Sequence, residues 1–175
     1  MSQLTAYDKF LQQALKYGFS LYGLPATGQT VSYAAGDDGD HRAGYPRTGA
    51  RWVDNNDGTV TDLATGVTYM ADFGNTGMTW EQALNFAAAL TLAGYSDWRL
   101  ANAFELFVLY DFTTGYPVVN TTFFKNTGST FYHTSTTPTL TPLYIVALGL
   151  WEGGLSLKYK TALLGSVYVR GGITR

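Results

Sequence analysis

The chain of 175 residues contains no cysteine. This absence excludes disulfides, thiolate zinc sites, cysteine-bound copper and cysteine nucleophiles. Charged residues make up only 14% of the sequence, whereas soluble domains typically contain about 25%. The formal net charge is −2, and proteins that bind nucleic acids usually carry a basic patch and a high pI. We therefore expect no nucleic-acid partner.

Long apolar segments are also missing. No stretch reaches the roughly 20 consecutive apolar residues that a transmembrane helix needs, so we expect no membrane insertion. The first residues lack the positively charged segment and the apolar run of a secretory signal peptide. We therefore expect any export to use another route, such as assembly onto a virus particle or a dedicated secretion system.

The chain is rich in apolar and aromatic residues, which make up 46% and 15% of it. This composition and length suit one domain with a substantial core, which we place at residues 23–175. Residues 1–22 are predicted to form a separate amphipathic helix, because apolar residues such as Leu4, Tyr7 and Leu11 recur at helical spacing. That helix could pack on its own domain, or it could mediate homo-oligomerisation or attachment.

Residues 51–69 predict a β-hairpin followed by a further turn and strand. The turn segment 54–58, Asp-Asn-Asn-Asp-Gly, has the composition of a calcium loop. In an EF-hand, however, the glycine occupies position 6 and a glutamate position 12, whereas here Gly58 is at position 5 and Thr65 at position 12. We interpret the segment as an Asx-rich turn, with no metal or cofactor.

Two helices are predicted from capping boxes, in which an N-cap side chain is followed three residues later by Glu or Gln. Thr79 opens the first helix, for which Gly94 is the predicted stop, and Asn102 opens the second, which should end near Asp111. The segment 97–100, Asp-Trp-Arg-Leu, is too short for a third helix.

The segment 97–100, between the two helices, is predicted to form a buried corner of the chain. Trp98 lies between two opposite charges, and we expect Arg99 to pair with Asp97 or with a backbone carbonyl. This is a structural role and not a catalytic one.

After Asp111 the only acidic residue is Glu152. Short β-rich segments there are separated by Thr, Pro and Gly and predict strands near residues 123–124, 131–132, 143–150, 155–157 and 166–170. Helix, hairpin, two helices and then a series of strands give an α+β fold rather than alternating βαβ units.

Several segments together resemble the Lcl C-terminal domain family. The likeness runs from about residue 34 to residue 172 and rests on RWVDNNDGTVTD at 51–62, ATGVTY at 64–69, TWEQAL at 79–84, GYSDWRL at 94–100, NAFEL at 102–106, YHTSTT at 132–137 and YVR at 168–170. The chain departs from the family pattern at Ala101, where the family has Pro, and at His133, where it usually has Trp. Residues 139–164 contain little of the Asn- and Tyr-rich sequence that is typical of the family.

The resemblance implies a C-type-lectin-like fold, with two helices packed on antiparallel sheets. It also implies a ligand face in the C-terminal half, at about residues 130–168. Members of the family are mostly binding modules of adhesins, surface proteins and phage proteins. Some are variable proteins of diversity-generating retroelements, which rewrite a C-terminal segment while the scaffold stays fixed. A virus particle or a cell surface is therefore the expected location.

Large apolar residues occur at predicted turns of this C-terminal segment, where water normally has access. Such residues indicate an interface or a ligand surface, unless they fold back onto the core of the domain. The predicted ligand-binding residues are His133, Thr139, Leu140, Leu143, Tyr144, Ala147, Leu150, Trp151, Glu152, Leu155, Leu157 and Tyr159.

Three functions can be weighed on these features. We favour a non-enzymatic module with a retroelement-diversified surface that binds a protein or cell-surface ligand. The alternative is a structural or adhesin subunit of a virus particle or cell-surface assembly, without a diversified site. A hydrolase would need His133 beside a serine such as Ser135 and a buried acid, but the Gly-x-Ser-x-Gly motif is missing.

Overall fold

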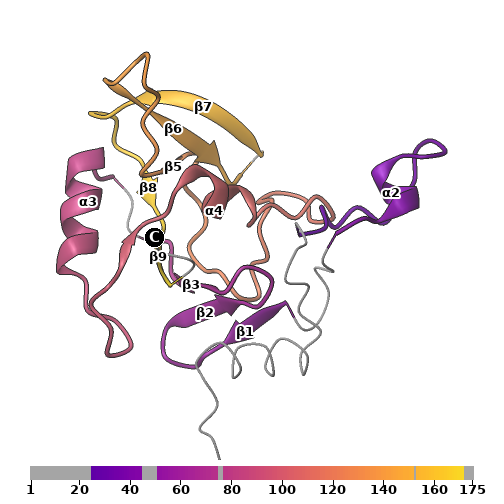
Figure 1. The fold of residues 1–175 in the computed structure, drawn as a ribbon, viewed down its shortest axis with the longest axis horizontal. Helices are drawn as coiled ribbons and strands as arrows, with labels where there is room; N and C mark the ends of the chain where they lie inside the picture. The colour runs from indigo at the N-terminus through magenta and orange to yellow at the C-terminus, as the bar shows by residue number, and fades with distance from the viewer. Residues whose placement is uncertain (1–24, 45–50, 75–76, 152, 172–175) are drawn as a thin grey trace, which may run out of the picture.

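The computed structural model describes residues 25–44, 51–74, 77–151 and 153–171 (Figure 1). They form a mixed α+β fold with two sheets and a few short helices. The predicted N-terminal helix, residues 1–22, lies outside the described residues. None of the helices within the described ranges is long and apolar enough to cross a membrane.

The first sheet has five strands, and every neighbouring pair is antiparallel. In spatial order they are β1 (Trp52–Asp54), β2 (Thr59–Asp62), β3 (Val67–Met70), β9 (Tyr168–Gly171) and β4 (Arg99–Leu100). The predicted hairpin is confirmed, with Trp52 opposite Asp62. The Asx turn is confirmed too: Asp54 accepts a hydrogen bond from the Asn56 amide, and Asp57 accepts two from Thr59.

The second sheet has four strands and lies above the first in Figure 1. Its spatial order is β7 (Gly154–Tyr159), β6 (Tyr144–Gly149), β5 (Tyr132–His133) and β8 (Gly165–Ser166). Strands β5 and β8 are parallel, and the other pairs are antiparallel. The predicted strand at residues 123–124 is absent, because Phe123 and Phe124 lie in a turn closed by hydrogen bonds to the Asn120 carbonyl.

The structure describes three helices: α2 (Asp38–His41), α3 (Trp80–Ala89) and α4 (Ala103–Phe107). Both predicted capping boxes are present, at Thr79 for α3 and at Asn102 for α4. The predicted ends were too late, because Leu90 is already extended after α3. Gly94 instead has φ +78° in the turn that follows, a conformation that glycine adopts at little cost.

The corner between α3 and α4 is buried as predicted, with Trp98 only 4% exposed. Of the two partners expected for Arg99, the backbone carbonyl is confirmed, whereas Asp97 pairs with Arg170 instead. Arg99 binds both carboxylate oxygens of Glu105, at 2.7 and 2.5 Å, and also donates to the carbonyl of Gly171. Glu105 completes the capping box of α4, so one side chain fixes both the helix start and the corner.

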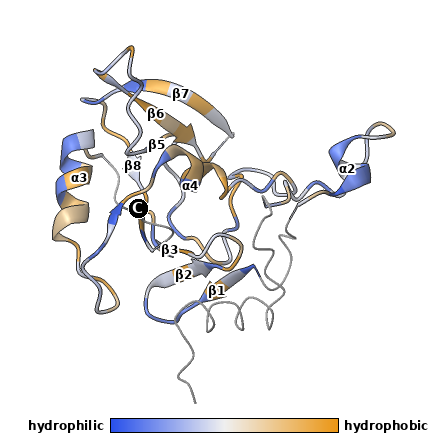
Figure 2. Cartoon of the chain, in the orientation of Figure 1, coloured by the Kyte–Doolittle hydropathy of each residue, from blue (hydrophilic) through white to orange (hydrophobic). Residues whose placement is uncertain are grey.

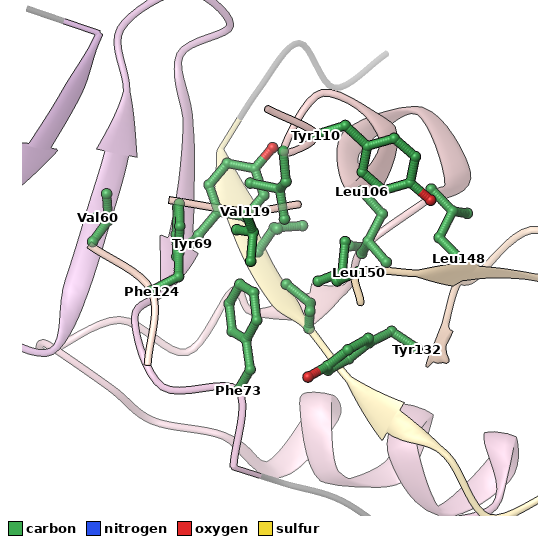
Figure 3. Close-up of a cluster of buried hydrophobic side chains, with 14 of the residues drawn as sticks. Val60, Tyr69, Phe73, Leu106, Tyr110, Val119, Phe124, Tyr132, Leu148 and Leu150 are labelled. Atoms are coloured by element: carbon green, nitrogen blue, oxygen red, sulfur yellow. The ribbon is translucent and has the colours of Figure 1, made fainter. Parts of the chain in front are cut away.

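An aromatic cluster connects the two sheets (Figure 3). The ring of Phe124 contacts those of Trp52, Tyr69 and Phe73, with centroids 5.0, 5.8 and 5.2 Å away. Phe73 in turn contacts Tyr132 of the second sheet at 5.9 Å. One core thus holds the second sheet against the first, and the hairpin of β6 and β7 is built on it.

Candidate functional site

The β6–β7 hairpin contains most of the predicted ligand-binding residues. Its two strands pair without interruption over six residue pairs, from Tyr144 opposite Tyr159 to Gly149 opposite Gly154. Because side chains alternate between the faces of a strand, Leu155, Leu157 and Tyr159 share one face of β7.

That face is the core face of the second sheet. The residues opposite Leu155 and Leu157 are Leu148, which is fully buried in the main cluster, and Val146, which packs against it. Helix α4 contacts β6, but the core ends before β7. Leu155, Leu157 and Tyr159 are 63%, 51% and 56% exposed. The apolar face that is buried at β6 is therefore exposed to solvent at β7, the outer strand of the sheet. Figure 2 shows part of β7 in the hydrophobic colour.

Aromatic pairs lie at the two ends of the hairpin. The rings of Tyr144 and Tyr159 have centroids 4.3 Å apart, and the hydrogen bond that the Tyr144 hydroxyl donates to Tyr159 raises the pKa of Tyr144 above its ordinary value. At the hairpin turn, Trp151 stacks on Tyr116 at 6.2 Å with an interplanar angle of 14°. Both pairs present large, rigid, amphipathic rings, which are common in binding surfaces.

The loop before β6 adds two exposed leucines, Leu140 and Leu143. Leu143 lies at the base of the hairpin, since its carbonyl accepts a hydrogen bond from the Lys160 amide. We call the following set the hairpin surface: Thr139, Leu140, Leu143, Tyr144, Trp151, Leu155, Leu157 and Tyr159. All of these are exposed or half-buried, and Glu152 lies outside the described residues.

Three predicted ligand-binding residues, His133, Ala147 and Leu150, are instead fully buried. His133 and Ala147 are opposite each other in the interior pair β5–β6, on the face away from Leu155. The side chain of Leu150 joins the main core although the residue begins a turn. The turn itself is exposed through Trp151.

His133 has an interior role. Its Nε2 lies 2.9 Å from the carbonyl oxygen of Met78, and because a carbonyl only accepts, Nε2 carries the proton. Within the described part of the chain, Nδ1 is buried without a hydrogen-bond partner, and no hydrogen bond joins His133 to Ser135. The arrangement thus differs from the serine–histidine pair that a hydrolase would require.

Burial of His133 predicts a specific pH dependence of stability. Desolvation lowers its pKa below the ordinary value of 6.5, and the bond to Met78 opposes this only in part. The unfolded chain therefore takes up a proton first as the pH falls below about 6.5, and the native state loses stability there. Urea denaturation between pH 7 and pH 5 should show this loss, and His133→Gln should reduce it.

His41 supplies the matched control, because it is the other histidine and it is exposed. His41→Gln should leave the pH dependence of the free energy of unfolding as in the wild type. An equal loss of stability on acidification in the wild type and in His133→Gln would contradict the role assigned to His133.

Sequence reasoning missed four exposed aromatic residues that precede the predicted ligand face: Phe104, Phe107, Phe112 and Tyr116. Tyr110 places two of them beside the hairpin, because its ring contacts Phe107 and Phe112 while its hydroxyl bonds both backbone groups of Gly154. Tyr116 stacks on Trp151. Of these four residues, only Phe104 could have been recognised as exposed from the local sequence, because it lies between the two polar ends of a capping box.

A hollow of about 890 Å³ lies elsewhere, between residues 26–44 and residues 111–123. Threonines dominate its lining, with Trp52 and Phe123 as the aromatic members. Two of its polar side chains are engaged locally: Asp111 accepts hydrogen bonds from Thr113, and Asn120 accepts one from Thr122. The hollow is separate from the hairpin surface.

Comparison with known proteins places the chain in a family. The model of the Lcl C-terminal domain matches residues 58–170, which is more than half of the chain and includes the whole hairpin surface. The segments predicted to bear the resemblance lie largely within this range. No curated protein sequence matches the chain. The chain belongs to the Lcl C-terminal domain family.

Proposed function

We propose that this domain is a non-enzymatic binding module whose hairpin surface recognises a protein ligand, free or on a cell surface. The observation that carries the proposal is the row Leu155, Leu157 and Tyr159, exposed on the core face of β7. Contiguous exposed apolar surface is typical of interaction sites. The aromatic pairs at both ends are the kind of anchor that dominates binding energy.

The apolar character of this surface favours a protein over a glycan. Its polar side chains are hydroxyl groups, at Thr139, Tyr144 and Tyr159, and no described carboxylate belongs to it. A sugar site would normally contain more Asp, Asn and Glu. Calcium-dependent recognition is likewise disfavoured, because Glu152 is the only acidic residue after Asp111 and calcium sites normally use several carboxylate oxygens.

We further propose a C-type-lectin-like fold and a retroelement-diversified surface. The second idea is supported by how the hairpin is held. Its register and its turn depend on backbone bonds, such as that from the Gly153 amide to the Gly149 carbonyl. The side chains of Leu155 and Leu157 are exposed and belong to neither core cluster, so their identity can change without loss of the scaffold.

Population sequencing of the gene tests diversification. Among copies of the locus, we expect substitutions to concentrate at the codons of the hairpin surface, such as Leu155, Leu157 and Trp151. Codons for the buried neighbours Ala147 and Leu148 should stay fixed. A nearby reverse transcriptase gene and a near-copy of the 3′ end that differs only at adenines should accompany this. Even variation over both sets of codons would favour the structural or adhesin subunit instead.

Binding can be tested with Trp151→Ala once the wild-type protein has selected a ligand from an array of purified surface proteins. Loss of an aromatic anchor of an interface commonly costs about 2 kcal/mol or more of binding free energy, so Kd should rise at least about tenfold. The free energy of unfolding should change little, because Trp151 is an exposed residue.

Tyr33→Ala is the matched control for this experiment. Tyr33 is another exposed aromatic residue, and it precedes α2, which projects away from β7 in Figure 1. Its replacement should leave Kd unchanged. Equal losses of affinity for Trp151→Ala and Tyr33→Ala, or none for either, would contradict binding through the hairpin surface.

A further inference from the structure

Strand β7 forms an open edge of the second sheet. Within the described part of the chain it pairs only with β6, and Figure 1 shows it at the outer side of the sheet. An edge strand presents a row of backbone groups that another strand can bind.

Two hydrogen bonds establish which backbone groups of β7 point outward. The Lys160 amide donates to the Leu143 carbonyl, so the pair Leu143–Lys160 is hydrogen-bonded. The Val146 amide donates to Thr136, away from β7. Because bonded and non-bonded pairs alternate along an antiparallel ladder, Leu155, Leu157 and Tyr159 direct their N–H and C=O groups away from β6.

These outward groups are available. In the described residues, the amides of Leu155, Leu157 and Tyr159 have no hydrogen-bond acceptor, and the Leu155 and Leu157 carbonyls have no donor. The Tyr159 carbonyl accepts one bond, from Ala162, which leaves a second lone pair.

The edge also lacks the usual protection against strand pairing. Proteins shield such edges with proline, β-bulges or charged side chains at the edge. Residues 154–159 contain no proline, and the register with β6 has no bulge. Lys158 lies on the other face, where its Nζ is 4.0 Å from the centre of the Phe131 ring.

We propose that β7 pairs with β7 of a second copy of this chain, antiparallel, about a two-fold axis at Leu157. Leu157 then bonds Leu157 of the second copy, and Leu155 bonds Tyr159 of the second copy, so all outward groups acquire partners. Apolar side chains face each other across the axis on the hairpin-surface side. The two sheets become one continuous sheet.

The lysines of β7 favour this register. With the axis at Leu157, Lys158 faces Ser156 of the second copy and Lys160 faces Gly154. A register centred on Lys158 would place two lysines opposite each other, which is destabilising. In this register no lysine lies directly opposite another lysine.

This dimer is independent of the proposed ligand binding. Pairing uses the backbone edge of β7, whereas a ligand would contact the side chains on its face. Two hairpin surfaces would lie side by side and could engage a ligand bivalently.

Charge substitution at the axis tests the proposal in the full-length chain. Sedimentation equilibrium of the wild type should show concentration-dependent doubling of the 19.1 kDa mass. Leu157→Lys and Leu157→Glu should each remain monomeric at all concentrations, because the substituted residue faces its own copy. An equimolar mixture of the two variants should restore the doubled mass, since opposite charges then meet.

Leu155→Lys is the matched control, because this lysine would face the ring of Tyr159, where a cation is tolerated; it should still dimerise. Near-UV circular dichroism verifies that each variant is folded. A wild type that stays monomeric at all concentrations, a mixture that stays monomeric, or single Leu157 variants that dimerise like the wild type would each overturn the proposal. Trp151→Ala should leave the dimer intact, so failure of ligand binding and failure of self-pairing are distinguishable.

Discussion

Asp62→Ala is expected to reduce the free energy of unfolding by about 3–5 kcal/mol, the usual cost of leaving one member of a buried ion pair alone. Asp62 and Arg51 are both fully buried, and their side chains form two hydrogen bonds, at 2.8 and 2.7 Å. Arg51 also donates to the Val108 carbonyl at 3.0 Å and lies over the Trp52 ring. Without the carboxylate, a guanidinium would remain in the core without its counter-charge.

Asp62 also holds the turn after β2, where it accepts hydrogen bonds from the Ala64 amide and the Thr65 hydroxyl. Urea denaturation measures the loss. Asp97→Ala is the control, because Asp97 is 58% exposed and pairs with Arg170 at the surface; such pairs contribute about 1 kcal/mol at most. Equal effects of the two substitutions would show that Asp62 is not part of a buried electrostatic anchor.

The two helix starts and the first hairpin could be predicted because their determinants are local. A capping box needs only an N-cap residue and a Glu or Gln three positions later, as at Thr79 and Gln82. The ends of the helices were predicted less well. Where α4 stops depends on the packing of Leu106 and Leu109 into the core, and no single residue in the sequence marks that point.

The carboxylate partner of Arg99 could not be inferred from its neighbours in sequence. Asp97 is nearer along the chain, but it lies outside β4, which begins at Arg99. The start of α4 places Glu105 next to Arg99, and Asp97 instead forms an ion pair with Arg170 on β9. The pairing of β4 with β9, some seventy residues apart in sequence, determines which carboxylate each arginine binds.

Which side chains of the candidate site are exposed also depends on tertiary packing and could not be predicted from the sequence. Leu150 and Leu155 are both leucines next to a glycine-rich turn, yet the first is buried and the second exposed. The alternation Leu155, Leu157, Tyr159 would normally predict a strand with a covered apolar face. That face is open because helix α4 lies against β6 and the core stops there.

Phe124→Ala is expected to cost about 3–5 kcal/mol of unfolding free energy, as is usual when a core phenylalanine is truncated. Phe124 is fully buried and contacts the rings of Trp52, Tyr69 and Phe73. The space that it leaves would lie between the sheets, where rigid rings cannot close it. Urea denaturation is the measurement, with the 82% exposed Phe104 as the control; Phe104→Ala should change stability by less than about 0.5 kcal/mol.

The same substitution tests whether the hairpin surface depends on the core below it. From Phe124 the ring contacts continue through Phe73 to Tyr132, and Tyr132 is opposite Leu148 on β6. Loosening this chain of contacts should lower the hydrogen-exchange protection of β6 amides together with that of β2 and β3. Protection lost in β2 and β3 alone would mean that the two sheets open separately, and that the hairpin surface is supported by contacts other than those of the aromatic cluster.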